Sequence, residues 1–169
     1  MEKEILYIAY GSNLNLSQMK YRCPTAKVVG ASEIKDYELV FRGSRHSAVA
    51  TIEPCEGSIV PILLWNIKPE DEKSLDRYEG YPSFYGKEDM DIMLDNKNIS
   101  AMVYTMTPGH KFGEPSEHYR KAIEDGYLDA GFDIDLLHDA VDKTISQIEE
   151  LEDIGEIMEQ GNIFGMKWW

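Results

Sequence analysis

Cysteine and histidine, two residues that often build metal sites, are scarce in this sequence of 169 residues. The two cysteines, Cys23 and Cys55, are too few for a disulfide scaffold and lack the short paired spacing of a zinc site. The four histidines are too dispersed to indicate a metal site: His46, His110, His118 and His138. We therefore expect reduced thiols, no bound metal and no cofactor.

Long hydrophobic runs are also missing. No segment approaches the roughly 20 consecutive apolar residues of a membrane-spanning helix. The apolar stretch near the start, in MEKEILYIAYG, is too short and too soon interrupted for a secretory signal. The sequence therefore predicts a cytoplasmic protein without a membrane partner.

Positively charged residues are few compared with negatively charged ones. Lys and Arg number 17 and Asp and Glu number 31, which gives a formal net charge of −14 at pH 7. A chain of this charge repels polyanions, which argues against nucleic acid and anionic membranes as partners. Hydrophobic residues make up 43% of the chain, enough for a globular protein with its own core.

The first two thirds of the sequence, to about residue 107, have the β-branched and aromatic segments typical of strands. The first segment is apolar throughout, which predicts a central strand buried on both faces. The cluster of Asp and Asn at residues 95–98 predicts the turn of a hairpin. The predicted strands cover residues 5–10, 34–41, 48–52, 59–67, 90–94 and 99–106.

Four helices are predicted, two short ones within the β region and two after it, at residues 16–21, 69–78, 116–123 and 133–160. In the last, an apolar seam follows helical spacing at Leu137, Val141, Ile148 and Leu151. We expect this seam to pack on the β region or on a second chain, so a homodimer is a candidate assembly. The chain divides into a first domain, 1–132, and a helical extension, 133–169, that ends in Trp168-Trp169.

A polar loop follows the first strand at Tyr10-Gly11-Ser12-Asn13-Leu14. Its backbone N–H groups stand at the start of a predicted helix, where a carboxylate or an oxyanion can bind. Gly11 allows close backbone approach, and Ser12 and Asn13 add a hydroxyl and an amide. Gly-Ser-Asn is also an ordinary turn composition, so this loop alone supports both a binding site and a plain turn.

Glu79 ends the helix predicted at residues 69–78, close to its apolar face. Partial burial and the negative end of the helix dipole would both raise the pKa of this carboxyl group, as in general acid–base catalysts. An exposed glutamate beside the Gly80 cap is the alternative.

Nucleophilic catalysis has weaker support. Nothing in the sequence pairs Cys23 with His46 as a thiol and its base, and Ser12 lacks the G-x-S-x-G elbow of a hydrolase.

The order of the segments resembles the γ-glutamylcyclotransferase-like family, which includes AIG2-like proteins and γ-glutamylamine cyclotransferases. The resemblance is carried by Tyr7-Ile8-Ala9-Tyr10-Gly11-Ser12-Asn13-Leu14, then Ala48-Val49-Ala50-Thr51-Ile52, Leu75-Asp76-Arg77-Tyr78-Glu79-Gly80 and Tyr104-Thr105-Met106-Thr107. It implies an α+β fold with a small mixed β-barrel in residues 1–132 and flanking helices. The long acidic helix and the Trp-Trp end depart from the family pattern.

The resemblance also implies residue roles. Glu79 would be the acid–base catalyst, and the loop would bind a γ-glutamyl group. The candidate binding residues are Tyr7, Tyr10, Gly11, Ser12, Asn13, Leu14, Tyr85 and Tyr119. The implied enzyme is a cyclotransferase, an acyltransferase that converts a small γ-glutamyl amide or amino acid to 5-oxoproline and a free amine without a cofactor. A non-catalytic binding protein and a hydrolase built on Ser12 or Cys23 are the alternatives.

Overall fold

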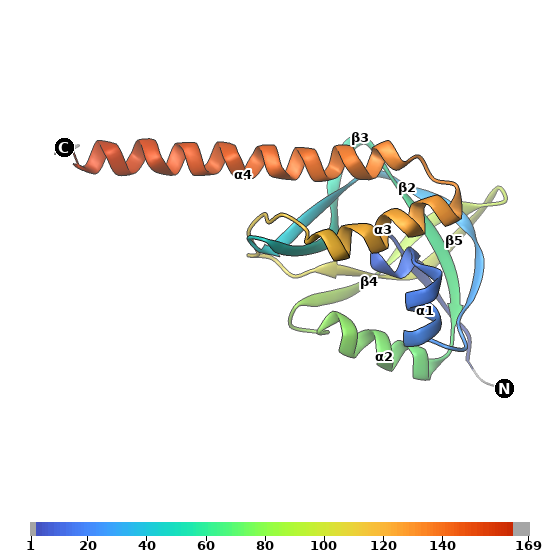
Figure 1. Cartoon of the computed structure of the whole chain (residues 1–169). Coiled ribbons are helices and arrows are strands. Elements are labelled where there is room, and N and C mark those ends of the chain that lie inside the picture. The colour runs from blue at the N-terminus through green and yellow to red at the C-terminus, as the bar shows by residue number, and fades with distance from the viewer. Residues whose placement is uncertain (1–2, 164–169) are drawn as a thin grey trace.

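The structure is a computed structural model that describes residues 3–163. In these residues, one five-stranded sheet is surrounded by helices (Figure 1). The strands are β1 (Ile5–Ala9), β2 (Lys27–Ser44), β3 (Ser47–Ile67), β4 (Tyr85–Leu94) and β5 (Lys97–Met106). The helices are the short 3₁₀ helix η1 (Ser12–Leu14), α1 (Leu16–Arg22), α2 (Pro69–Glu79), α3 (Glu117–Ala130) and α4 (Ile134–Ile163). The predicted mixed α+β class is confirmed.

The strand order is β2-β3-β1-β5-β4, so β1 lies at the centre of the sheet. It pairs antiparallel with β3 and parallel with β5. Its apolar residues explain this position, because Tyr7, Ile8 and Ala9 are all buried. The central strand predicted from the sequence is therefore confirmed, and its end delivers the polar loop into the middle of the molecule.

Two antiparallel hairpins flank β1. In the β4–β5 hairpin, the predicted turn is confirmed: Asp95 and Asn96 have φ angles of 50° and 63°, which these residue types tolerate. The β2–β3 hairpin is longer than the sequence indicates, with pairing from Ser44↔Ser47 to Lys27↔Asn66. Polar residues and two register shifts interrupt its hydrophobic pattern, so only fragments of it were predicted as strands.

The closed barrel implied by the resemblance is not what the described sheet forms. β2 and β4 are its outer strands, and no ladder of backbone pairs joins them within residues 3–163. They approach through side chains instead, with the Ser32 hydroxyl donating to the Met93 carbonyl. The Leu94 side chain occupies the space beside Gly30, where an added Cβ would lie 3.0 Å from Leu94 Cδ1. The sheet is therefore curved but open.

Helix α4 packs on the molecule only with its first half. Leu137, Val141 and Ile148 are buried, but Leu151 is 58% exposed, so the expectation that it is buried with the others is wrong within this chain. Figure 1 shows the reason: the red half of α4 extends past the sheet and α3. That a second chain covers the exposed half of α4 stays a prediction. Trp168-Trp169 lies outside the described residues.

None of the helices described here has the length and apolar character needed to cross a bilayer.

Candidate active site

The polar loop after β1 is held close to two other elements. Its 3₁₀ turn closes with a hydrogen bond of 3.0 Å from the Leu14 N–H to the Gly11 carbonyl. A Cβ at Gly11 would lie 3.3 Å from the Ala50 Cβ on β3 and 3.5 Å from the Tyr119 hydroxyl on α3. A glycine therefore lets the backbone approach both neighbours. The first N–H groups of a 3₁₀ helix have no acceptor within that helix.

A cavity of about 240 Å³ lies where β1 ends. The structure brings Glu79 together with all but one of the predicted binding residues in its lining: Tyr7, Tyr10, Gly11, Ser12, Asn13, Tyr85 and Tyr119. The exception is Leu14, which is fully buried and packs against Gly126 of α3. Leu14 therefore anchors the loop and does not line the cavity.

Two tyrosine hydroxyls of the cavity donate their protons to the backbone. The Tyr10 hydroxyl donates to the Tyr104 carbonyl at 2.6 Å, and the Tyr85 hydroxyl donates to the Ala50 carbonyl at 2.5 Å. A hydroxyl has one proton to donate and two lone pairs that accept. These two oxygens can therefore only accept further hydrogen bonds, as from an ammonium group.

Two other hydroxyls of the cavity accept hydrogen bonds from the protein instead of donating them. The Tyr7 hydroxyl accepts from Nδ2 of Asn13 at 2.9 Å, and the Tyr119 hydroxyl accepts from the Ala50 N–H at 3.0 Å. Each keeps its own proton, which it can donate to a carboxylate or an oxyanion. The cavity therefore offers both acceptors and donors to a small zwitterionic ligand.

Glu79 reaches the cavity from the C-terminal end of α2. The helix begins with Pro69 in its first turn, and the Asp71 carboxylate accepts a hydrogen bond of 3.0 Å from the Lys68 N–H. It ends at Gly80, whose φ of 64° and ψ of 36° form the left-handed cap that glycine favours. Leu75, one turn before Glu79, is fully buried and fixes the helix on the core.

Burial raises the pKa of Glu79 from 4.5 to about 7, and the positive charge of Arg22 opposes the rise. The negative end of the α2 dipole acts in the same direction as burial. A carboxyl group with such a pKa is present in both protonation states near neutral pH, which a proton-transfer catalyst requires.

The raised pKa predicts a pH-dependent stability difference between the protein and its Glu79→Gln variant. The folded state holds the Glu79 proton more tightly than the unfolded state, so the wild type loses stability as pH rises from about 4.5 to about 7. Above this window the variant should be more stable by about 1–3 kcal/mol, and below it the difference should vanish. Urea unfolding of both proteins at pH 4, 6 and 8 measures this; a difference independent of pH would contradict the raised pKa.

Neither Cys23 nor His46 lines the cavity. Burial raises the pKa of the Cys23 thiol to about 12, so it stays protonated at neutral pH. His46 is exposed between β2 and β3. Ser12 Oγ lies 3.0 Å from the Tyr78 hydroxyl, which is not a base. No three His, Cys, Asp or Glu side chains gather as a metal-binding group in the described part of the chain.

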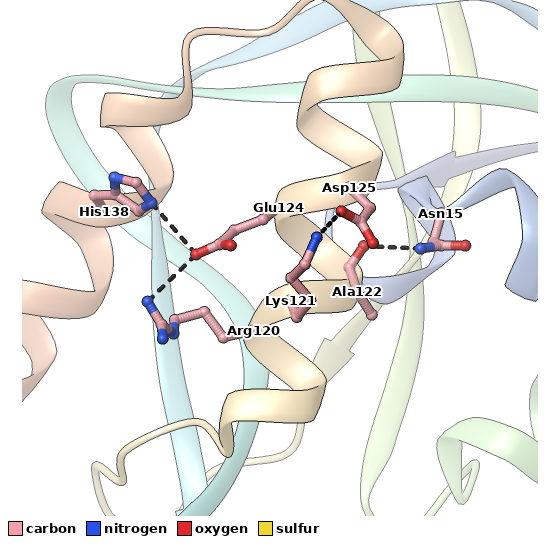
Figure 2. A network of polar contacts seen from close by, with 7 residues as sticks. All are labelled: Asn15, Arg120, Lys121, Ala122, Glu124, Asp125 and His138. Carbon is pink, nitrogen blue, oxygen red and sulfur yellow. Dashed lines mark hydrogen bonds and ion pairs between the residues drawn. The ribbon is translucent and has the colours of Figure 1, made fainter.

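Helix α3 contacts Asn15, the residue that follows the loop (Figure 2). Asn15 caps α1 by accepting a hydrogen bond of 3.0 Å from the Gln18 N–H, and its Nδ2 donates to the Ala122 carbonyl of α3 at 3.0 Å. On the other side of α3, Glu124 contacts both Arg120 and His138, the latter from α4. These contacts are partly exposed and contribute little individually. Arg120 and Glu124 both belong to α3, so the contact with His138 is the one that joins α3 to α4.

Residues of the site that were not predicted from the sequence include Tyr104 and Arg22. Tyr104 of β5 lines the cavity, and its hydroxyl donates to Oδ1 of Asp76 at 2.6 Å. Arg22, at the end of α1, has its guanidinium 3.7 Å from the centre of the Tyr78 ring. Tyr104 occurs in a segment that carries the family resemblance, but nothing in the sequence connects Arg22 to the loop or to α2.

A protein-family model described as "Gamma-glutamyl cyclotransferase, AIG2-like" matches residues 7–129. Gamma-glutamylcyclotransferase from Homo sapiens is 29% identical over 167 residues, which cover 90% of this chain and 88% of the human protein. The enzyme of that name from Mus musculus is 30% identical over 127 residues, covering 70% of this chain and 67% of the mouse protein. The family match includes both the loop and Glu79.

Solved structures agree with the sequence matches. One named "Gamma-glutamyl cyclotransferase" superposes with a TM-score of 0.74 at 27% identity, covering 82% of this chain and 86% of that one. YkqA from Bacillus subtilis superposes with a TM-score of 0.71 at 18% identity and covers 86% of this chain and 55% of that one. The second match concerns the fold alone.

Proposed function

This chain belongs to the AIG2-like γ-glutamyl cyclotransferase family, and from that membership we propose that it converts a γ-glutamyl amide or γ-glutamyl amino acid to 5-oxoproline and a free amine. The observation that carries the proposal is the placement of Glu79, a carboxyl group with a pKa of about 7, in a small cavity among hydroxyl groups of both polarities. The cavity also lacks an activated nucleophile among its described lining residues.

In the proposed reaction the substrate supplies its own nucleophile. The nitrogen of its α-amine attacks its γ-carbonyl carbon, and a five-membered lactam closes. The bond between that carbon and the amide nitrogen breaks, and the amine leaves. A cavity of about 240 Å³ with aromatic walls favours a folded substrate, which brings the reacting atoms together.

Glu79 would transfer the proton. As a carboxylate it takes a proton from the substrate ammonium group, and as the acid it then gives a proton to the leaving nitrogen. An α-amine titrates at about 8 or above, so transfer to a group with a pKa of about 7 costs little more than ~1.4 kcal/mol. With a carboxyl at its ordinary pKa of 4.5 the same transfer would cost about 5 kcal/mol.

The remaining groups suit the two charged ends of the substrate. The acceptor hydroxyls of Tyr10 and Tyr85 would bind the ammonium group, and the donor hydroxyls of Tyr7 and Tyr119 would bind the carboxylate. The backbone N–H groups of the 11–13 loop would stabilise the oxyanion that forms at the γ-carbonyl.

A non-catalytic binding protein with the same fold is the second candidate. It would need the hydroxyl groups but not a carboxyl group poised near neutral pH, so the raised pKa of Glu79 favours the enzyme. A hydrolase built on Ser12 would need a base that activates its hydroxyl, but the partner described for Ser12 Oγ is the Tyr78 hydroxyl. Cys23 is not among the residues that line the cavity, and burial raises the pKa of its thiol to about 12.

The proposal is tested by incubating the purified protein with a panel of γ-glutamyl amino acids, γ-glutamyl amines and glutathione, with mass detection of products. We expect 5-oxoproline from at least one substrate, in amounts equal to the amine released. Tight binding without turnover would support the binding protein, and release of glutamate would support a hydrolase.

Chelation is expected to leave turnover unchanged. The proposed reaction takes its nucleophile from the substrate and its proton transfer from Glu79, so no step needs a metal ion. Activity is measured before and after dialysis against EDTA. Loss of activity that zinc or magnesium restores would show that this mechanism is incomplete.

A further inference from the structure

Arg22 joins two parts of the site, although it is not among the residues that line the cavity. It is the last residue of α1. Its Nη1 donates to Oδ1 of Asn13 at 2.6 Å, and its Nη2 donates to Oε1 of Gln18 at 2.8 Å. Its guanidinium also lies over the ring of Tyr78, the neighbour of Glu79, at 3.7 Å. One side chain therefore contacts both the binding loop and the end of α2.

The contact with Asn13 determines which way its amide faces. A guanidinium has donors only, so the Asn13 atom beside it must be the oxygen. The amide nitrogen then faces Tyr7, and its hydrogen bond of 2.9 Å makes the Tyr7 hydroxyl an acceptor. The hydroxyl proton of Tyr7 is left to point elsewhere, and Tyr7 lines the cavity. Through Asn13, Arg22 thus determines that the Tyr7 hydroxyl is free to act as a donor, although Arg22 does not contact Tyr7.

Arg22 also places a positive charge near Glu79. Among the described residues that line the cavity, Glu79 alone has a charged side chain. Arg22 counteracts the rise in the Glu79 pKa that burial causes. Four phenols of β1, β4, α3 and the segment after β1 have pKa values that burial and the Glu79 charge raise above 10, so they stay neutral while Glu79 titrates: Tyr7, Tyr10, Tyr85 and Tyr119.

We propose that Arg22 is a positioning residue of this site, which through Asn13 directs the Tyr7 hydroxyl toward the substrate as a donor and which keeps a positive charge beside the Glu79 carboxylate. This inference rests on the proposed function. The two effects are separable, because the first depends on the fork of donors in arginine and the second depends on charge alone.

The test compares Arg22→Gln with Arg22→Lys. Arg22→Gln removes the positive charge, and Arg22→Lys keeps the charge but loses the fixed arrangement of N–H donors in the guanidinium group. In Arg22→Gln the acid limb of the pH profile of kcat/KM should move to higher pH by about half a pH unit or more. In Arg22→Lys this limb should stay near its wild-type position. Both variants should raise KM about ten-fold, the effect of losing one hydrogen bond to a charged group. Arg45→Gln, which removes an exposed arginine paired with Glu152, should change neither quantity.

A merely structural role for Arg22 would lower the stability of all its variants without moving the acid limb. An unmoved limb in folded Arg22→Gln would therefore overturn the charge effect. Tyr7→Phe tests the hydroxyl effect without disturbing Arg22: its KM should also rise about ten-fold, and the double variant with Arg22→Lys should be no worse than either single one. An unchanged KM in Tyr7→Phe, or additive effects, would overturn the donor role.

A measurement that needs no turnover separates this inference from the proposed function. The difference in unfolding free energy between a protein with Glu79 and its Glu79→Gln variant changes with pH, and the pH range of that change reports the Glu79 pKa. Urea unfolding measures this difference in the wild-type background and in the Arg22→Gln background. We expect the midpoint to move up in the Arg22→Gln background. If it moves while no γ-glutamyl compound is turned over, the proposed function is wrong and the charge effect stands; if it does not move, the charge effect is wrong.

Discussion

Glu79→Gln is expected to fold and bind substrate while losing at least about two orders of magnitude in kcat, the lower end of what general acid–base catalysis contributes. Glutamine keeps the shape of the side chain but cannot exchange a proton. The side chain lines the cavity at the end of α2, and burial raises its pKa to about 7. Steady-state kinetics give kcat, and the KM of the variant should change little because the hydroxyl groups proposed to bind substrate remain.

The matched control is Glu70→Gln in the first turn of the same helix, where the side chain is exposed. It makes the same chemical change outside the cavity and should leave kcat unchanged. A folded Glu79→Gln protein that retained more than about a tenth of the wild-type kcat would remove Glu79 from the catalytic role.

Gly126→Ala is expected to lower both stability and activity, although alanine is the better helix former. At this position of α3, an added Cβ would lie 2.7 Å from the Leu14 Cβ, 2.8 Å from the Leu14 carbonyl carbon and 3.0 Å from the Asn15 nitrogen. Overpacking of this kind costs about 1–3 kcal/mol, which exceeds the gain of about 1 kcal/mol in helix propensity. Because two of these atoms belong to the backbone, the binding loop must move, and we expect kcat/KM to fall by about ten-fold or more.

Gly155→Ala in α4 is the control for this substitution, since nothing lies within 4 Å of its added Cβ. Thermal unfolding and kcat/KM should show a neutral or slightly stabilising change there, with normal activity. If Gly126→Ala behaved in the same way, α3 would not hold the loop as tightly as the structure indicates.

The sequence predicted those elements of the fold whose hydrophobic pattern lies within one short segment. The uniformly apolar residues 5–10 predicted the central strand, and the Asp and Asn cluster at residues 95–98 predicted the turn of the β4–β5 hairpin. Strand pairing between distant segments was less visible. The full length of β2 and β3 and the open edge between β2 and β4 depend on backbone pairing and on contacts such as Ser32 with Met93, which leave no periodic pattern.

Helix α4 shows a different limit. The spacing of its apolar residues correctly predicted the helix, and the same spacing continues through Leu151. Periodicity identifies the face that would be buried but not whether a neighbour is present along the whole helix. Leu137 meets the core and Leu151 does not, because the helix is longer than the body on which it packs.

For the site, motifs identified residues that contact the cavity directly, but not the residues behind them. The loop and Glu79 were found because they occur as short sequence segments that resemble a family. Arg22 acts from another element through Asn13 and Tyr78, and only the geometry shows those contacts. Leu14 belongs to the same motif as Asn13 but faces the other way, because consecutive residues of a tight turn point in different directions.

In the proposed reaction, the substrate's own amine closes the ring. The most direct measurement uses a γ-glutamyl substrate with heavy nitrogen in its α-amine, in water enriched in heavy oxygen, with mass analysis of the products and an enzyme-free control. We expect 5-oxoproline that keeps the heavy nitrogen in its ring, contains no heavy oxygen and matches the released amine in amount. Glutamate carrying heavy oxygen would contradict the claim, because water would then be the nucleophile.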